Sequence, residues 1–367
     1  MAVFCDLSKA FDTVQHEILL DKLENYGLRG NTLKWFRSYL SNRKMFTQYK
    51  NNISDQVSIN CGVPQGSILG PLLFLIYVND LSNSLNKSKS ILFADDTTIY
   101  IANSCTKILF QDTNEDIASL KTWFDANKLL LNSQKTKYVL FRSKNMRFDD
   151  ELAISIGNDI IVRSSFTTFL GMNMDELLNW DVHVSYVKKK ISSALYILRS
   201  VKHVLSCSNL RLLYNALVEP HLMYGILLWS NTSCKNINLI AKTQKKAIRI
   251  INKAKYNEPS SNLFKVSKVV KLDDMISSSQ LEFMYKYTHD QLPRGIMELF
   301  NVNSNVHQYE TRQSNHPHVS KHKTSLFNNS FLHKAPRAFQ SVSCDLKNKA
   351  TLTSFKRTIK KLSFERY

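Results

Sequence analysis

The chain has 367 residues, of which 43% are hydrophobic and 22% charged, a balance typical of a folded globular protein with two or three packed units. It contains no run of about 18 apolar residues and no paired spacing among its six cysteines, so we expect neither a membrane span nor a zinc site, and scattered thiols suit a reducing compartment. The net charge of +19 is unevenly distributed: residues 1–150 carry 18 basic and 15 acidic side chains, and residues 151–367 carry 31 basic and 15 acidic ones. We therefore expect the second part to contact a polyanion. The alternative is a basic surface without a partner.

The first part of the chain alternates between strand and helix patterns. In chain order these predict a strand at residues 3–7, helices over 14–26 and 31–40, strands at 45–49 and 57–60, a helix after residue 67, hairpin strands at 90–93 and 97–101, a helix over 112–127 and a strand at 138–142. Gly27 is the expected stop of the first helix and Asn31 the expected N-cap of the second. Pro71 is expected in the first turn of the third helix.

The second part of the chain has mostly helical periodicity. Helices are predicted over residues 182–204, 209–218, 236–254, 273–288 and 352–362. Residues 301–335 are polar and rich in Asn, His, Ser and Lys, which predicts a loop or linker.

Acidic residues stand at strand ends in two places. Asp6 follows the first strand, where most aspartates are solvated caps or turn formers. Asp95 and Asp96 lie at the tip of the hairpin, where adjacent carboxylates repel each other and magnesium relieves the repulsion; a plain polar tip is the alternative. Nucleotide polymerisation needs two metal ions about 3.5–4 Å apart, which carboxylates from separate strands would hold.

Two other stretches carry groups suited to nucleotide chemistry. Glycines and a proline give the loop at residues 62–67 a rigid shape. It presents the Gln65 amide, and its backbone, including Gly66, would lie against a base pair or sugar; a plain helix-entry turn is the alternative. Lys135, just before a predicted strand, would donate a proton to leaving pyrophosphate or pair with phosphate, although most lysines are only solvated.

Read in order, these stretches resemble the palm of reverse transcriptases, in particular that of non-LTR (LINE-like) retrotransposons of the jockey type. The resemblance covers roughly residues 3–180 and rests on residues 6–14, 62–71, 93–97 and 135–137. Residues 169–172 resemble the primer-grip segment of that family. Residues 213–217, 220–225 and 244–249 resemble the stretch that follows the palm in these elements.

The resemblance implies a catalytic role for four residues. Asp6, Asp95 and Asp96 would be the catalytic acids and metal ligands for two Mg²⁺ ions, with Mn²⁺ as a substitute. Lys135 would be the proton donor, with Lys137 as its stand-in.

The resemblance also implies substrate-binding roles. Phe11 would be a steric gate, a ring that collides with the 2′ hydroxyl of a ribonucleotide; the alternative is that it only packs in the core. Gln65 and Gly66 would lie near the incoming nucleotide. Asp12 is expected to have a structural or capping role. Basic residues of the second part would contact template–primer phosphates, namely Lys188, Lys189, Lys190, Lys245, Lys246 and Arg249.

The implied fold is α+β, with a small antiparallel palm sheet and helices at residues 1–180, a helical thumb and extension at 181–300, and a polar linker with a basic helix at 301–367. The implied function is RNA-directed DNA polymerisation. Its partners would be an RNA template, a DNA primer or target and deoxynucleoside triphosphates, without a membrane, in the nucleus and cytoplasm. The sequence leaves the oligomeric state open.

The position of Asp6 leaves no room for the fingers strands that precede the family's palm, so we expect a truncated copy with the fingers largely absent. Such a chain would have very weak polymerase activity or none. The competing hypothesis is a catalytically inactive, nucleic-acid-binding remnant, and a structural protein with a chance Asp-Asp turn would require three ordered motif matches to be accidental.

Overall fold

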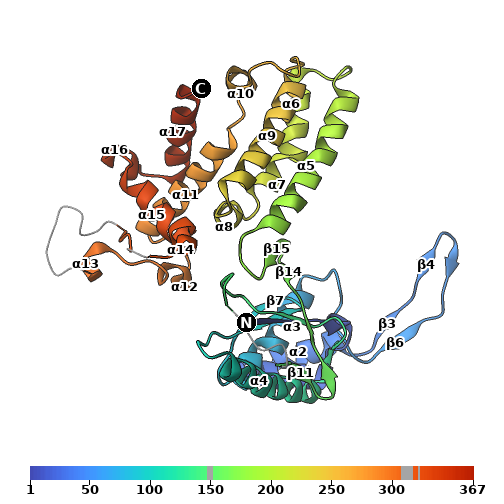
Figure 1. The fold of residues 1–367 in the computed structure, drawn as a ribbon. Helices are drawn as coiled ribbons and strands as arrows, with labels where there is room; N and C mark the ends of the chain where they lie inside the picture. The colour runs from blue at the N-terminus through green and yellow to red at the C-terminus, as the bar shows by residue number, and fades with distance from the viewer. Residues whose placement is uncertain (147–151, 307–316, 321–322) are drawn as a thin grey trace. The chain divides into compact units, whose positions relative to one another are not determined.

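The computed structural model describes residues 1–146, 152–306, 317–320 and 323–367. The chain divides into two compact units, Met1–Thr167 and Thr168–Tyr367 (Figure 1). Strands and helices are mixed in the first unit and helices dominate the second, so the α+β class is confirmed. None of the helices in these described ranges is long and apolar enough to cross a membrane.

The first unit is built on a five-stranded sheet with β1 at its centre. In spatial order the strands are β13 (Val162–Arg163), β10 (Lys137–Val139), β1 (Ala2–Cys5), β8 (Asp96–Tyr100) and β7 (Lys89–Phe93). All neighbours are antiparallel except β10 and β13. Val3 is almost fully buried at the centre, which explains why an apolar strand stands here.

Helices cover this sheet and supply most of the core. They are the 3-10 helices η1 (Ala10–Asp12) and η2 (Asn79–Ser84) and the α-helices α1 (His16–Asn25), α2 (Asn31–Leu40), α3 (Leu69–Val78) and α4 (Thr106–Ala126). Leu19, Leu73, Phe74 and Phe124 are fully buried in one cluster with β1. The predicted helices and hairpin are confirmed, with ends that differ by a few residues.

The helix ends near residue 27 test two predictions. Gly27 has φ +93° directly after α1, and the amide of Leu28 donates to the Leu23 carbonyl, so the predicted stop is confirmed. The predicted Asn31 cap is wrong, because Gly30 is the N-cap and Asn31 is already helical. Gly30 adopts φ 61° and ψ −128°, a backbone conformation that residues with a Cβ rarely adopt.

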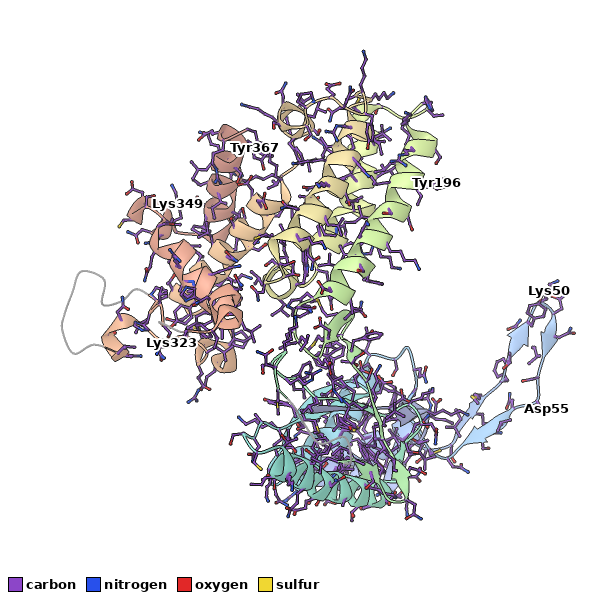
Figure 2. All side chains as sticks on the ribbon, viewed as in Figure 1. Lys50, Asp55, Tyr196, Lys323, Lys349 and Tyr367 are labelled. Atoms are coloured by element: carbon purple, nitrogen blue, oxygen red, sulfur yellow. The ribbon has the colours of Figure 1, made fainter. Side chains whose placement is uncertain are left out.

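A hairpin arm extends from the first unit between α2 and α3 (Figure 1). It has two short ladders, β3 (Arg43–Met45) with β6 (Val57–Ile59) and β4 (Gln48–Tyr49) with β5 (Asn52–Ile53). The predicted pairing is confirmed, but it is interrupted in the middle. Figure 2 labels Lys50 at the far end of the arm, where its φ of 54° closes the turn.

Short strand pairs complete the scaffold. They are β2 (Leu7–Ser8) with β9 (Leu130–Leu131), β11 (Ser155–Ile156) with β12 (Asp159–Ile160), and β14 (Phe166–Phe169) with β15 (Met172–Asp175). The pairing of β2 with β9 continues the line of β1 past Asp6 and brings residues near 132 beside it.

The second unit begins with a bundle around a long helix pair. Helix α5 (Asp181–Val201) packs on α9 (Cys234–Ile251), with α6 (Cys207–Leu217), α7 (Glu219–Met223), α8 (Ile226–Trp229), α10 (Ser261–Ser267) and α11 (Leu272–Thr288) around them. Ile191, Leu198, Tyr214, Trp229 and Ile248 are fully buried in its core. The predicted helices of this region are confirmed.

Residues after 300 pack on the other side of α11. They form α13 (Asn303–Val306), α14 (Ser325–Asn329), α15 (Phe331–Gln340), α16 (Cys344–Lys347) and α17 (Leu352–Glu365), preceded by α12 (Arg294–Met297). The loop predicted at 301–335 is therefore wrong where α13, α14 and the start of α15 lie, and residues 307–316 and 321–322 fall outside the described residues. Tyr285, Phe339 and Phe355 share a separate core here.

Candidate active site and basic groove

Strand pairing brings Asp6 next to the Asp95–Asp96 turn. Cys5, the last residue of β1, pairs with Thr97 of β8, so Asp6 and Asp96 follow and precede directly paired residues. Phe93 pairs with Asp96 across a two-residue loop in which Ala94 has φ +52°. The three carboxylates that the sequence singled out therefore share one end of two adjacent strands.

The charges of these carboxylates interact. The pKa of Asp96 is raised, first by partial desolvation of its carboxyl group and then by the negative charges of Asp95 and Asp6. The raised pKa means that the charged form of the Asp96 carboxyl is less favourable in the folded protein than in water. A cation placed among these three groups would remove that penalty.

The donor set suits a hard divalent cation, since all three groups offer carboxylate oxygens. Within the described ranges, however, no three His, Cys, Asp or Glu side chains already form a group able to hold a metal ion. The backbone thus places the carboxylates side by side, and their side chains are not gathered into a ligand set.

Lys135 reaches the same place from a neighbouring loop. Its Nζ lies 3.9 Å from Asp6 Oδ2, with 71% of the lysine side chain and 44% of the aspartate side chain exposed. The amide of Asn132 donates to the Asp6 carbonyl at 2.8 Å, which fixes the loop beside β1. An ion pair this exposed contributes little to stability, so Lys135 is free to contact a ligand.

Phe11, in η1, and the glycine-rich loop at residues 62–67 belong to the same unit as the three carboxylates. The Phe11 ring packs on Phe74 at a centroid distance of 4.5 Å, so it does take part in core packing while remaining half-buried. Gln65 Nε2 donates to Asp12 Oδ1 at 2.9 Å, which links the loop to the end of η1. Gly66 is exposed and has φ +82°.

Gly62 ties this loop to the segment that carries Phe11. Its amide donates to the Val14 carbonyl at 2.7 Å, and the amide of Val63 donates to the Phe11 carbonyl at 2.9 Å. A Cβ on Gly62 would stand 2.9 Å from the Asp12 carbonyl oxygen. The sequence marked the loop as special but not this close approach of two backbones.

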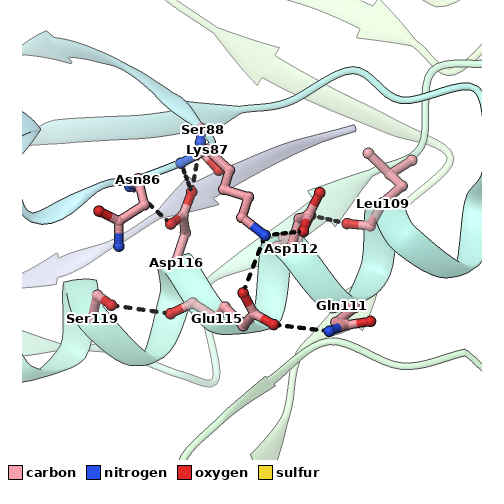
Figure 3. A network of polar contacts seen from close by, with 10 residues as sticks. Asn86, Lys87, Ser88, Leu109, Gln111, Asp112, Glu115, Asp116 and Ser119 are labelled. Carbon is pink, nitrogen blue, oxygen red and sulfur yellow. Dashed lines mark hydrogen bonds and ion pairs between the residues drawn. The ribbon is translucent and has the colours of Figure 1, made fainter.

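Sequence reasoning missed the network that anchors the start of β7 (Figure 3). The buried Asp116 carboxylate accepts the backbone amides of Asn86, Lys87 and Ser88 at 3.0, 3.1 and 2.5 Å. Burial opposes the charge of Asp116, but the hydrogen bonds from residues 86–88 outweigh it and lower its pKa. Lys87 Nζ also pairs with Asp112 at 2.7 Å. No local sequence pattern predicts these contacts, which fix the start of β7, the strand that precedes Asp95.

A basic groove follows α5 and α9 in the second unit. It holds two adjoining hollows of about 190 and 540 Å³, and Lys246, Arg249 and Tyr256 line both of them. Lys188 and Lys245 line the larger hollow. The groove is a surface of cationic side chains, as binding to a phosphate backbone requires.

The predicted basic residues divide between this groove and the rest of α5. Lys189 and Lys190 do not line these two hollows, although both are exposed. Lys190 Nζ instead lies over the Tyr186 ring at 5.5 Å. Sequence reasoning missed Lys253 and Tyr256, which line the smaller hollow and lie beyond the end of α9.

Comparisons with known proteins bear on this geometry. Residues 1–174 match the family described as reverse transcriptase (RNA-dependent DNA polymerase). The probable RNA-directed DNA polymerase from transposon BS of Drosophila melanogaster is 27% identical over 75% of this chain and 31% of its own length. The probable RNA-directed DNA polymerase from transposon X-element of the same organism is 25% identical over 80% of this chain and 32% of its own.

A third relative is similar to the same extent. The RNA-directed DNA polymerase from mobile element jockey of Drosophila funebris is 25% identical over 74% of this chain and 30% of its own length. The chain therefore spans about a third of the length of these relatives.

Proposed function

Residues 1–174 are a reverse transcriptase domain whose homologues are RNA-directed DNA polymerases of Drosophila non-LTR retrotransposons, and from this premise we propose that the chain extends a primer by copying an RNA template. The substrates would be deoxynucleoside triphosphates. The observation that carries the proposal is the pairing of Cys5 with Thr97, which sets Asp6 beside Asp95 and Asp96.

The three carboxylates would hold the divalent ions of the reaction. Bound Mg²⁺, or Mn²⁺ in its place, supplies activation of the primer 3′ hydroxyl and stabilisation of the charge on the leaving oxygens. Asp6 directly follows β1 and Asp96 is the first residue of β8, so the pairing of these strands holds the two backbone positions close together. The raised pKa of Asp96 supports this role, because a bound cation would offset both the desolvation of its carboxyl group and the negative charges of Asp95 and Asp6.

Neighbouring residues would position the nucleotide and move a proton. Lys135, which is exposed and near Asp6, would protonate the leaving pyrophosphate. Phe11 rests against Phe74, and a ring held in this way would reject the 2′ hydroxyl of a ribonucleotide by shape. The loop at Gln65 and Gly66 is tied to the Phe11 segment and would lie against the incoming nucleotide.

The basic groove of α5 and α9 would bind the phosphates of the template–primer hybrid. Its lysine and arginine side chains contact phosphate without reading base sequence. Lys189 and Lys190, which also lie on α5, would add positive charge beside the groove. In this proposal the first unit is the palm and the second unit includes the thumb. Because the RNA would be copied at a DNA target, the protein would act in the nucleus as well as in the cytoplasm.

Primer extension tests the proposal. The purified chain, in excess over an RNA template with an annealed DNA primer, should add deoxynucleotides in Mg²⁺ or Mn²⁺, but no faster than the very weak activity expected from the sequence. Asp95→Asn should abolish addition, because one carboxylate is removed from the set, whereas Asp55→Asn on the hairpin arm should leave it unchanged. Extension that survives in Asp95→Asn, or no addition by the native chain with either ion, would overturn the proposal, and hybrid binding without extension would leave the inactive-remnant hypothesis in its place.

A further inference from the structure

The segment that contains Tyr224, Gly225 and Trp229 has no part in the mechanism above, yet it meets the turn between β14 and β15. We propose that this segment is a clamp that holds residues 170–172 in one conformation, so that Tyr224 is a positioning residue for a nucleic-acid strand bound at that turn. The part of the inference that concerns nucleic acid rests on the proposed function, whereas the clamp itself does not.

The turn needs an external support because its backbone is strained. Strands β14 and β15 are joined by Leu170 and Gly171, with φ of 46° and 77°. A two-residue hairpin turn with both φ values positive normally carries Asn or Asp at the first position. Leucine there costs roughly 1 kcal/mol, so the turn would populate other conformations if nothing held it.

Tyr224 supplies support at the first half of the turn. Its hydroxyl donates to the Leu170 carbonyl, 54 residues away in the chain. Its ring lies directly against Gly171, where an added Cβ would stand 3.4 Å from Tyr224 Cε1. Glycine at position 171 therefore serves the positive φ, and the ring packs against it at van der Waals distance.

Gly225 supports the second half. It has φ +62°, and a Cβ at this position would overlap the thioether of Met172. Met172 is only 6% exposed, so its side chain is confined at the contact. Two consecutive residues thus contact the two ends of one turn.

The clamp is itself fixed to the core of the second unit. The Tyr224 amide donates to the Pro220 carbonyl at 2.9 Å, at the end of α7. Its carbonyl accepts the indole N–H of Trp229 at 3.0 Å, and Trp229 is fully buried. The spacing Tyr-Gly-x-x-x-Trp therefore connects a core tryptophan to a surface turn, which gives the end of the motif at residues 220–225 a structural role.

The exposure of Tyr224 favours positioning over simple packing. Tyr224 is 54% exposed and Gly171 is exposed, so the supported turn faces solvent. A tyrosine that served only stability would gain more from burial. An ordered backbone that remains open to solvent is what a bound strand requires, since its contact geometry is then set before binding.

Amide hydrogen exchange tests the clamp without any ligand. Tyr224→Phe removes only the hydroxyl, and loss of one hydrogen bond of about 1 kcal/mol should speed exchange at residues 170–173 roughly fivefold. Tyr196→Phe is the matched control, because Tyr196 is 72% exposed on α5 (Figure 2). Gly225→Ala should also speed exchange, and adding Met172→Ala should restore part of the protection by removing the overlap. Unchanged exchange in Tyr224→Phe overturns the clamp.

Photo-crosslinking tests the role toward nucleic acid. A hybrid whose primer ends in a photoreactive nucleotide should crosslink to residues 169–172 of the full native chain. Tyr224→Phe should lower the crosslink yield several-fold while the affinity for the hybrid, measured by fluorescence anisotropy, stays the same. Equal yields in both proteins, or crosslinks only outside the turn, overturn the positioning role. A native chain that binds no hybrid overturns the proposed function, and the exchange result then stands alone for the clamp.

Discussion

At the scale of single residues, like charges beside β1 and β8 lower stability in the absence of metal. The folded-state pKa of Asp96 lies above its usual value, so the stability it contributes is present at low pH and is lost as pH rises through that raised pKa. We predict that Asp95→Asn raises the melting temperature in EDTA at neutral pH, because one of the repelling charges is gone. Calorimetry in EDTA measures this, with Asp55→Asn as the control.

The same variants report on metal binding. Added Mg²⁺ should raise the melting temperature of the native chain and have little effect on Asp95→Asn, since a ligand that binds only the folded state stabilises it by mass action. Equal Mg²⁺ shifts in the two proteins would contradict metal binding at this turn.

His183 is a second residue whose protonation matters. It is 2% exposed, its Nδ1 accepts the Asn173 amide at 3.3 Å, and its Nε2 has no hydrogen-bond partner among the described residues. Burial lowers its pKa below the usual value, so the unfolded chain takes up a proton before the folded chain does. Stability is therefore lost as pH falls below about 6.5.

We predict that this loss is visible in urea unfolding between about pH 7.5 and about pH 5.5. His183→Gln should show a smaller fall in the free energy of unfolding over that interval, whatever its stability at pH 7.5. His203→Gln, an exposed site just past α5, should keep the native fall. The same pH dependence in all three proteins would show that His183 is not the group responsible.

At the scale of elements, the contact between the glycine-rich loop and the η1 segment depends on Gly62. Gly62→Ala meets both a positive φ and the Asp12 backbone, and we predict that it destabilises the chain by at least about 2 kcal/mol. Gly66→Ala is the matched control, because it has a similar φ but open space around it and should cost only about 1 kcal/mol. Denaturant midpoints measure the difference, and equal costs would mean that the two backbones move apart easily.

Most elements could be predicted from sequence because their periodicity is local. The helices α1, α5, α9 and α11 and the hairpin β7–β8 all follow apolar spacing that a short window contains. The cap of α2 could not be predicted, because it depends on the unusual φ and ψ of Gly30 and not on a side-chain hydrogen bond from a capping residue. In α15 the signal was present in Phe331, Ala335 and Phe339 at a spacing of four, but polar neighbours concealed it.

The candidate site was predictable only in part. Two-metal chemistry predicted that Asp6 would lie near Asp95 and Asp96, because separate strands must bring the metal-binding carboxylates together. The support of Asp116 for residues 86–88 and of Tyr224 for Leu170 joins positions about 30 and 54 residues apart. Such contacts form only when the whole unit packs, and no short pattern encodes them.

At the scale of the whole molecule, the charge excess of the second part predicts salt-dependent binding to nucleic acid. The double variant Lys245→Gln, Lys246→Gln should weaken binding to an RNA–DNA hybrid and reduce the slope of log affinity against log salt by about one unit for each phosphate that is no longer neutralised. The adjacent pair Lys360→Gln, Lys361→Gln on α17 removes the same charge outside the groove. Equal slopes for the two double variants would mean that net charge, and not the groove, attracts the polyanion.

The hairpin arm has a practical consequence for anyone who handles this protein. Met45, Phe46, Tyr49, Ile53 and Val57 are each more than half exposed on a two-stranded ribbon whose outer edges pair with no other described strand. Such a ribbon invites edge-to-edge association and early proteolytic nicking. Since Met45 and Val57 pair directly, replacing residues 46–56 by Asn-Gly would close the ribbon with a tight turn and give a better-behaved sample for crystallisation.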